Sequence, residues 1–291
     1  MNTESKTAIV TGANAGIGYA SALQLAERGL TVVMACRNQA RGEHARAKIV
    51  EATSNPRVHL LSLDTSSMSS VRAFAADFSA RFQRLDVLIN NAGNFDLSQK
   101  TPKLTSEGFE AIWATNYLGP WLLTRLLLPL LQQSAPSRVI NVGSKGLLVY
   151  PFLRIEFDNL DGSKRYSPQR AYYHSKLALL TYTLDLARRL EGTGVLANLV
   201  RVPAVQVALD RLPPMPAWKL SVYKMKRRRS LAPEAMASAY TALALDSAWD
   251  SATGHVVDEN VRSVGSSKCS RDADTAAELW RVSAESLGEG A

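Results

Sequence analysis

The 291-residue sequence is poor in cysteine, because Cys36 and Cys269 are the only two. Two cysteines so far apart do not make a disulfide framework, and neither stands at a spacing typical of metal ligands. This scarcity favours a protein of a reducing compartment, and we expect no metal.

Long hydrophobic runs are also missing. The most apolar segment, Trp121 to Leu131, contains Arg125 and Pro129 and falls well short of the roughly 20 residues that span a bilayer. The first ten residues, MNTESKTAIV, lack the basic start and the apolar core of a secretory signal. We therefore expect no transmembrane segment and no secretion, and we predict a cytoplasmic protein.

Charge is not concentrated in one region. The formal net charge is +8, but the basic residues are dispersed, and only Lys224 to Arg229 form a dense run. The chain contains no recognisable nucleic-acid-binding module and no aromatic residues within this run, so we expect no nucleic-acid partner. Such a run is usually a solvated surface, which leaves open a peripheral contact with anionic membrane lipid or with an acidic carrier protein.

What the chain does contain is a regular alternation of short β-branched runs and longer amphipathic runs. Hydrophobic residues make up 46% of the sequence and charged residues 21%, with no break in composition. The predicted strands are 7–10, 31–35, 58–63, 87–90, 138–142 and 195–200, and the predicted helices are 16–28, 38–52, 68–82, 105–131 and 168–190. Repeated βαβ units predict an α/β fold, with a single-domain, Rossmann-type doubly wound parallel sheet over residues 1–291 and helices on both faces.

A glycine-rich turn, Thr11 to Gly18, connects the first predicted strand to the first helix. At this position a dinucleotide pyrophosphate meets free backbone N–H groups and the positive end of a helix dipole. Gly12 would permit the turn, Gly16 a close approach of the backbone, and Gly18 tight packing of the helix. The spacing and its position after the first strand predict a nicotinamide dinucleotide site.

The residues after the second strand bear on the choice of cofactor. An NAD enzyme usually offers a carboxylate there to the ribose 2′-hydroxyl, whereas a 2′-phosphate needs a cation. The order here is Ala35-Cys36-Arg37, with no acid. Since an arginine can pair with a phosphate and stack on adenine, we predict NADP(H).

Four motifs, taken together, resemble the short-chain dehydrogenase/reductase family: TGANAGIG, NNAG (Asn90 to Gly93), a serine after RVINVG (Ser144), and YYHSK. The segments ACRN, FDNL, HSKLALL, LARRLEGTGV and ELWRVSAESLG are similar to the branch that includes retinol dehydrogenases. The likeness covers nearly the whole chain, and it implies an oxidoreductase that acts on an alcohol or a carbonyl group.

This resemblance implies a role for individual residues. The catalytic positions would be Asn116, Ser144, Tyr172 and Lys176. The cofactor-binding positions would be Gly12, Asn14, Gly16, Ile17, Gly18, Arg37, Asp64, Asn91, Ala92, Gly93, Tyr172, Lys176, Pro203 and Val205. Asp64 would contact adenine and Asn116 would relay protons, although two alternatives remain open: Asp64 as the cap of the helix that follows, and Asn116 as a partner of the backbone within its own helix.

The segment AYYHSK places two tyrosines ahead of Lys176. On a helix both Tyr172 and Tyr173 share a face with Lys176, so spacing leaves both open. The family pattern selects Tyr172 as the acid and leaves Tyr173 as a wall or packing residue. A phenol has a pKa of about 10, and we expect the Lys176 ammonium to stabilise its phenolate while Ser144 holds the substrate oxygen.

The sequence departs from the family after the strand that ends at Val200. Ala204 replaces a glycine, and Val207 replaces a threonine that helps to hold the nicotinamide. Gln206 and backbone groups are candidates to compensate. Besides an NADP-dependent reductase of a hydrophobic ketone or aldehyde, the sequence therefore leaves open a non-redox dehydratase, isomerase or cyclase, and a cofactor-binding protein without turnover.

Two further segments follow these motifs. Residues of about 205–232, rich in proline and containing Met215, Trp218 and Tyr223, are predicted to form a variable lid over a small apolar substrate. A C-terminal extension of about 265–291 is small and polar enough to be partly mobile. The apolar helix faces at Leu126 and Leu180 are consistent with a homodimer and equally with core packing.

Overall fold

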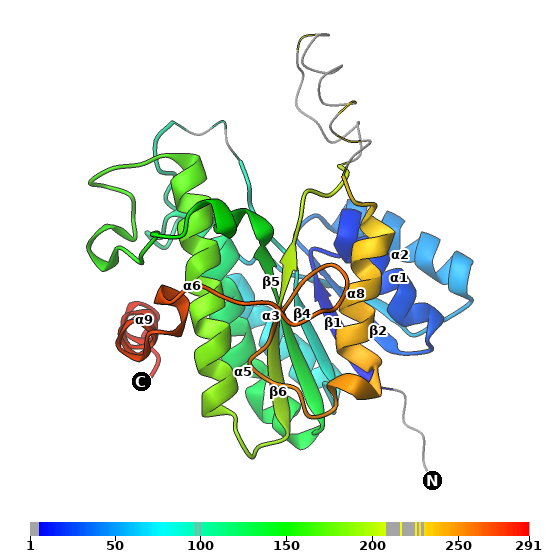
Figure 1. The fold of residues 1–291 in the computed structure, drawn as a ribbon. Helices are drawn as coiled ribbons and strands as arrows, with labels where there is room; N and C mark the ends of the chain where they lie inside the picture. Colours follow the sequence, from blue (N-terminus) through cyan, green and yellow to red (C-terminus); the bar gives the residue numbers. More distant parts are fainter. Residues whose placement is uncertain are drawn as a thin grey trace.

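A seven-stranded parallel sheet forms the centre of the protein (Figure 1). The computed structural model describes residues 6–96, 98, 100–207, 216, 225, 227 and 230–290. The strands lie in the order β3-β2-β1-β4-β5-β6-β7, so the chain changes direction across the sheet between β1 and β4. Ligands bind at the carboxyl ends of the strands beside such a switch point. The strands are β1 (Thr7–Thr11), β2 (Thr31–Cys36), β3 (Val58–Ser62), β4 (Val87–Asn90), β5 (Ser137–Ser144), β6 (Val195–Val202) and β7 (Val256–Val257).

Helices cover both faces of the sheet, as predicted. One face carries α1 (Gly16–Glu27), α2 (Gln39–Thr53) and α8 (Pro233–Leu245), and the other carries α3 (Met68–Arg81), α5 (Gly119–Gln133) and α6 (Pro168–Arg189). Side chains alternate along β1: Ile9 packs with α3 and α5, whereas Ala8 and Val10 pack with α1 and α8. Strands buried on both faces consist of almost continuous apolar residues, which explains why the strand runs could be recognised in the sequence.

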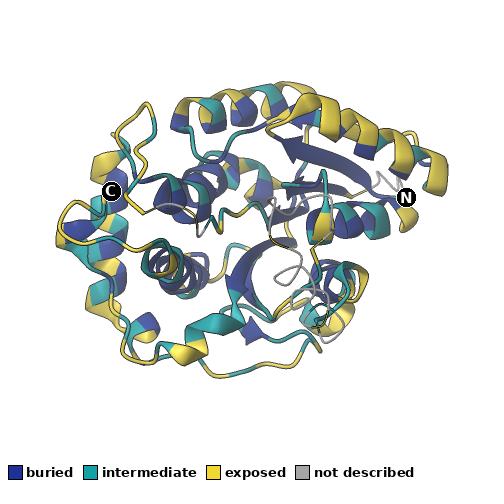
Figure 2. Ribbon diagram, turned by 90° about the horizontal axis from the view of Figure 1, so that it is seen from above, coloured by how far each residue is buried: buried dark blue, intermediate teal, exposed yellow. Residues whose placement is uncertain are grey.

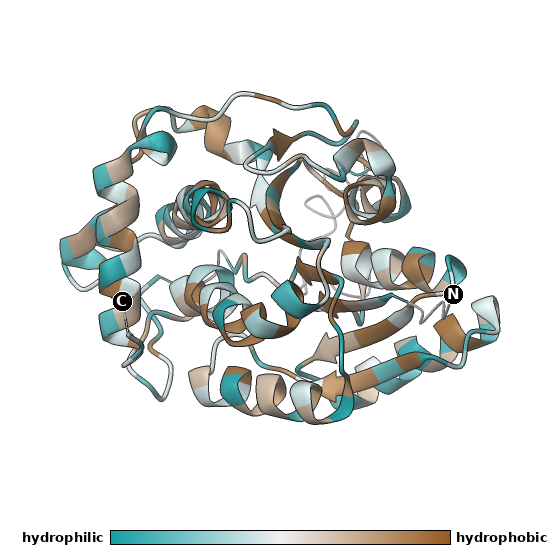
Figure 3. Ribbon diagram, turned by 90° about the horizontal axis from the view of Figure 1, so that it is seen from below, coloured by the Kyte–Doolittle hydropathy of each residue, from teal (hydrophilic) through white to brown (hydrophobic). Residues whose placement is uncertain are grey.

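Burial follows the same layers. Viewed from above, the helices turn exposed residues outward and buried residues toward the sheet (Figure 2). From below, hydrophobic residues gather on the strands and on the inner sides of the helices (Figure 3). The predicted fold class is therefore confirmed.

The predicted helix from Thr105 to Leu131 begins later than expected. Residues 104–110 instead form a turn, in which Gly108 has φ +84° and Leu104 makes an antiparallel bridge with Glu110. The Glu110 carboxylate accepts a hydrogen bond from the Trp113 N–H (2.7 Å) and caps α4 (Ala111–Trp113). A π-helical turn, η1 (Ala114–Leu118), then leads directly into α5. The side-chain cap and the glycine turn override the helical periodicity of residues 105–110.

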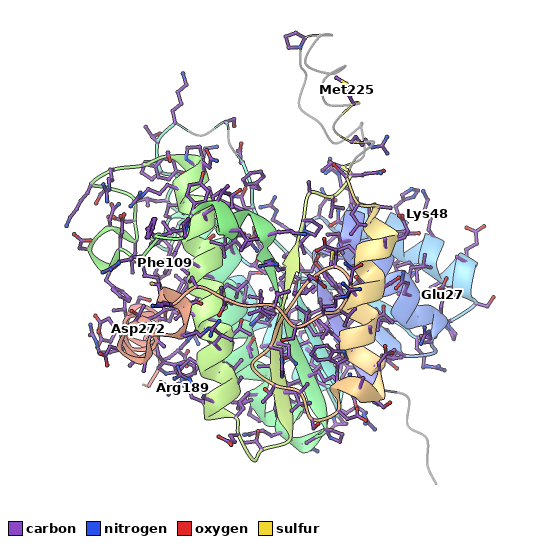
Figure 4. The ribbon with its side chains drawn as sticks, viewed as in Figure 1. Glu27, Lys48, Phe109, Arg189, Met225 and Asp272 are labelled. Carbon is purple, nitrogen blue, oxygen red and sulfur yellow. The ribbon has the colours of Figure 1, made fainter. Side chains whose placement is uncertain are left out.

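The residues after Gly265 are not a mobile tail. A 3₁₀ turn, η6 (Cys269–Arg271), precedes helix α9 (Ala273–Ser286), which packs against α6. Trp280 of α9 lies edge-on to Trp121 (ring centroids 5.3 Å apart), and the Arg189 guanidinium stands 4.0 Å from the centre of its ring. Arg189 and the α9 cap Asp272 both border this helix in Figure 4. An amphipathic face on α9 therefore outweighs the small polar composition of the segment.

The predicted lid lies largely outside the described residues, as do Met215, Trp218, Tyr223 and most of the basic run from Lys224 to Arg229. Within the part of the chain that the structure describes, no helix is both long enough and apolar enough to cross a bilayer.

Candidate active site

The glycine-rich turn lies at the carboxyl end of β1, as the sequence predicts. Gly12 and Gly16 adopt φ values of +67° and +58°, which glycine tolerates far better than other residues. A Cβ on Gly18 would lie 2.5 Å from the Gly12 carbonyl oxygen, so only glycine lets the helix approach the turn so closely. Ala15, at the cap of α1, offers no side-chain hydrogen bond. The first N–H groups of α1 are therefore left for an anionic ligand.

A second loop, Asn91 to Gly93, is tied to this turn. The Thr11 hydroxyl accepts hydrogen bonds from the N–H groups of Asn91 and Ala92, each at 2.9 Å. The Asn91 amide donates to the Thr11 carbonyl oxygen at 2.9 Å. Thr11 was not among the predicted site residues, although it belongs to the TGANAGIG motif. These hydrogen bonds hold the carboxyl ends of β1 and β4 together, and the two loops form one continuous floor at this edge of the sheet.

Over this floor opens a cavity of about 1120 Å³. It collects most of the predicted cofactor residues: Gly12, Asn14, Gly16, Ile17, Gly18, Arg37, Asp64, Asn91, Ala92, Gly93 and Val205. Pro203, Tyr172 and Lys176 are not among its lining residues. Lining residues that the sequence did not single out include Arg41, Thr65, Asn94 and Thr115. The size of the cavity and its glycine cradle fit a dinucleotide.

One end of the cavity is basic. Arg37, directly after β2, is 75% exposed, and its guanidinium stands 3.6 Å from the Asp64 carboxylate. Arg41, one turn into α2, also lines the cavity. Asp64 further accepts hydrogen bonds from the N–H and the hydroxyl of Ser66, and Ser67 rather than Asp64 caps α3. Two arginines and one partly neutralised carboxylate therefore face this end.

The four predicted catalytic residues come from three elements. Ser144 ends β5, Tyr172 and Lys176 lie on α6, and Asn116 lies in the π-helical turn. The Ser144 hydroxyl lies close enough to the Tyr172 phenol to oppose the rise in its pKa. The Lys176 ammonium donates to the Val142 carbonyl oxygen (2.7 Å) and lies 5.9 Å from the centre of the Tyr172 ring. Residues far apart in the sequence thus meet at the carboxyl ends of β4 and β5.

Asn116 joins this group through the backbone of the loop after β4. Its Oδ1 accepts from the Asn94 N–H (2.7 Å), and its Nδ2 donates to the Asn94 carbonyl oxygen and to the Ser175 hydroxyl, both at 3.0 Å. A Cβ on Gly93 would lie 3.5 Å from Asn116 Oδ1 and 3.8 Å from Lys176 Nζ. Asn116 thus bonds the loop after β4 and α6, and not the backbone of its own helix. π-helical turns often occur at functional sites.

Burial dominates the electrostatics of this group. It raises the pKa of Tyr172 to about 12, against the opposing effect of the Ser144 hydroxyl. Burial also lowers the pKa of Lys176 to about 8. The sequence predicts a Tyr172 pKa lowered by the ammonium, and the structure differs because desolvation of the phenol outweighs a cation that lies beneath the ring. Tyr172 therefore holds its proton at neutral pH.

The two tyrosines of AYYHSK have different surroundings. Tyr173 packs on Tyr150 (ring centroids 4.6 Å apart) and so closely on Gly146 that a Cβ there would lie 2.4 Å from its hydroxyl. Phe95 packs on Tyr172, with ring centroids 4.3 Å apart, and is 53% exposed. Tyr172 thus lies beside Ser144, whereas Tyr173 packs on the loop that contains Gly146 and Tyr150.

The segment after β6 runs beside the cavity. Val205 pairs with Leu231, the Leu231 N–H donates to the Ala204 carbonyl oxygen (3.0 Å), and the Gln206 side chain donates to the Ser230 carbonyl oxygen (3.1 Å). Ala204 is not among the residues with positive φ, so its backbone does not require glycine. Val207 lines the cavity. Of the two departures from the family, the one at Ala204 is thus accommodated.

Comparison with known proteins agrees with this arrangement. A family model described as short chain dehydrogenase matches residues 6–154. Retinol dehydrogenase 12 of Mus musculus is 40% identical over 285 residues, which cover 97% of this chain and 86% of that protein. Retinol dehydrogenase 11 of Homo sapiens is 39% identical over 284 residues, with 97% and 86% covered.

Among solved structures, an uncharacterized protein from Mycobacterium paratuberculosis superimposes with a TM-score of 0.73 at 30% sequence identity. The match covers 99% of this chain and 95% of that one. The family model, the relatives and the fold therefore agree on the same family. The chain belongs to the short-chain dehydrogenase/reductase family, within its retinol dehydrogenase-like branch.

Proposed function

We propose that this protein is an NADP(H)-dependent oxidoreductase that reduces a hydrophobic ketone or aldehyde and can oxidise the matching alcohol. Its family uses NAD(P)(H) and acts on alcohol and carbonyl groups. The finer assignments, which are the cofactor, the direction and the role of Tyr172, rest on the geometry of the site. The observation that carries them is that one cavity has a basic end at Arg37 and Arg41 and extends to Gly93, which lies beside Asn116 and Lys176.

The choice of NADP(H) is supported by Arg37 and Arg41. Both line the cavity at the end of β2, where an NAD enzyme would offer a carboxylate to the ribose. A 2′-phosphate there would accept charge-assisted hydrogen bonds from one or both guanidinium groups. The nearest carboxylate, Asp64, is held by Ser66 and pairs with Arg37 at 3.6 Å. The N–H groups of α1 and Gly12, Gly16 and Gly18 would hold the pyrophosphate.

Catalysis is assigned to four side chains. Bound NADPH would supply the hydride. Tyr172, whose pKa burial raises to about 12, is protonated at neutral pH and so is suited to donate a proton to the carbonyl oxygen. Ser144 would hold that oxygen, and the Lys176 ammonium would stabilise the phenolate as it forms. Asn116 would hold the loop at Asn94 in place, with a relay of protons as its further role.

An apolar substrate is supported by the surroundings of the tyrosine. Phe95 covers one side of the Tyr172 ring. Leu148, Val149 and Phe152, which follow Ser144 in the chain, are all exposed, Phe152 to 92%. Large exposed apolar side chains grouped near a site are typical of a surface that receives an apolar ligand. The named relatives are retinol dehydrogenases, and retinol is an apolar alcohol.

The proposal is tested by fluorescence titration of the purified protein with NADPH and with NADH. We expect tighter binding of NADPH, and in Arg37→Ala and Arg41→Ala a loss of about tenfold or more for NADPH with little change for NADH. Arg57→Ala is the matched control, because it removes an exposed guanidinium that, among the described residues, donates to the Gly29 carbonyl oxygen. Equal weakening of NADPH binding and NADH binding would show that the arginines do not recognise the 2′-phosphate.

Turnover is tested on a panel of apolar ketones and aldehydes, followed by cofactor absorbance and by product mass. Conversion with consumption of NADPH is the expected result. Conversion without any change in the cofactor would indicate the non-redox alternative, which the similarity to dehydrogenases does not favour. Binding of NADPH with no conversion across the panel would indicate a cofactor-binding protein.

A further inference from the structure

An ion pair crosses the carboxyl end of the sheet next to Ser144. Lys145 follows Ser144 directly, and its ammonium stands 2.6 Å from the Glu259 carboxylate. Glu259 lies two residues after β7, and β6 separates β5 from β7 in the sheet. The pair therefore joins two strands that are not neighbours. Neither residue lines the cofactor cavity.

The residues on either side of Lys145 both touch the tyrosine segment. The Ser144 hydroxyl lies beside the Tyr172 phenol and accepts a hydrogen bond from the Gly146 N–H at 3.2 Å. Gly146 in turn lies against the Tyr173 ring. The position of the Lys145 backbone thus sets where the Ser144 hydroxyl stands relative to the Tyr172 phenol.

The other partner is held by a rigid turn. The Asp258 carboxylate accepts from the N–H groups of Asn260 (2.9 Å) and Arg262 (3.0 Å). The Val264 N–H donates to the Val256 carbonyl oxygen at 2.8 Å. Val261 is held at φ +60°, an unfavourable conformation for a β-branched residue that persists only where its surroundings impose it. Glu259 therefore projects from a fixed support.

The pair is half-buried, with 40% of the Lys145 side chain and 20% of the Glu259 side chain exposed. One carboxylate oxygen of Glu259 accepts from Lys145, while the other is buried and has no hydrogen-bond partner among the described residues. The bond to Lys145 lowers the pKa of Glu259 and keeps it ionised. Removing the Lys145 ammonium would leave the less exposed Glu259 carboxylate without its partner, and a local rearrangement that exposes this carboxylate to solvent would then be favoured.

We propose that the Lys145–Glu259 ion pair is a positioning device that holds Ser144 and Gly146 against the Tyr172–Tyr173 segment. The inference rests on the proposed reductase function, because its effect on catalysis is exerted through Ser144. Lys145 and Glu259 are positioning residues, and neither touches the substrate or the cofactor. A displacement of Ser144 on the ångström scale weakens its hold on the carbonyl oxygen in the transition state.

Lys145→Met and Glu259→Gln test this role with side chains of nearly the same size. Each variant is expected to lower kcat by about ten- to a hundredfold, with the NADPH dissociation constant unchanged. The charge-swapped protein, Lys145→Glu with Glu259→Lys, is expected to recover most of the lost kcat. Lys164→Met is the matched control, since Lys164 pairs at 2.5 Å with Asp158 on the exposed surface. Unchanged kcat in both single variants would overturn the proposal.

Hydrogen exchange supplies a readout that needs no substrate. The Gly146 N–H is protected by the Ser144 hydroxyl, so the peptide 144–149 is expected to exchange faster in Lys145→Met and Glu259→Gln, and not in Lys164→Met. If the wild type reduced no carbonyl, the proposed function would fail, and the exchange result would still decide the positioning role. Unchanged exchange would refute it even if kcat fell.

Discussion

The Asn116 side chain forms hydrogen bonds with both polar groups of the Asn94 backbone. It accepts from the N–H at 2.7 Å and donates to the carbonyl oxygen at 3.0 Å. These two hydrogen bonds fix the loop after β4. They thereby also fix Phe95, whose ring lies against Tyr172. A π-helical turn at Asn116 widens the helix just where the side chain must reach the loop. Asn116 is therefore connected to Tyr172 through packing as well as through its proposed chemistry.

The two adjacent tyrosines are distinguished by paired substitutions. Tyr172→Phe is expected to lower kcat by about a thousandfold, because it removes the only proton that we assign to the carbonyl oxygen, while NADPH binding stays nearly unchanged. Tyr173→Phe is expected to keep most of the activity, since its ring packing on Gly146 and Tyr150 is retained. Steady-state kinetics and a fluorescence titration measure both. Similar losses in the two variants would contradict the assignment of Tyr172.

The rate of reduction is expected to fall as pH rises through about 8. The Lys176 pKa is lowered to about 8 by burial, so its ammonium is present below that pH and is lost above it. Tyr172, with a pKa of about 12, keeps its proton over the same range and cannot cause the decline. The measurement is kcat against pH at saturating NADPH, with circular dichroism as the control for unfolding. A flat profile through pH 8 would show that Lys176 stays charged in the cofactor complex.

Acid is expected to destabilise the protein through His174. Its Nε2 accepts from the Glu156 N–H (2.9 Å), which requires a neutral ring, and burial lowers its pKa from 6.5 to about 4. The unfolded chain binds the proton more readily, so stability is complete above about pH 6.5 and falls toward pH 4, by about 3 kcal/mol in total.

Urea unfolding at several pH values measures this contribution. His174→Gln is expected to flatten the dependence over this range. His44→Gln, on the exposed face of α2, serves as the control and should leave the dependence unchanged. An equally steep loss in His174→Gln would assign the acid sensitivity to other groups.

The C-terminal helix is expected to contribute to stability as an integral part of the fold. Trp280→Ala removes the contacts with Trp121, Tyr182 and Arg189, and should lower the free energy of unfolding by about 2–4 kcal/mol. Arg281→Ala, at the neighbouring exposed position on α9, is expected to cost much less, because its ion pairs with Glu278 and Glu285 lie on the surface. Equal effects of the two substitutions would mean that α9 is not packed in solution.

The strands and the motifs could be predicted from the sequence because they depend on local residues. Buried parallel strands are recognisable as apolar runs such as TVVMA, and the glycine turn has a spacing that few other structures need. The motif TGANAGIG predicted much of the cavity lining, and the segment YYHSK predicted that Tyr172 and Lys176 lie on one face of a helix. Arg41 went unnoticed because a lone arginine on an exposed helix face has no local signature.

Other features depended on contacts between distant parts of the chain. The start of α4 at Ala111 is decided by the Glu110 cap and the turn at Gly108, and α9 is held by partners on α5 and α6. The Tyr172 pKa rises because tertiary packing desolvates the phenol, which no residue spacing reveals. Lys145 and Glu259 are 114 residues apart, and only the sheet order brings their charges together. The sequence by itself thus determined the family and the chemical groups, whereas the tertiary structure decided their protonation, their support and their neighbours, because burial and long-range contacts exist only in the folded chain.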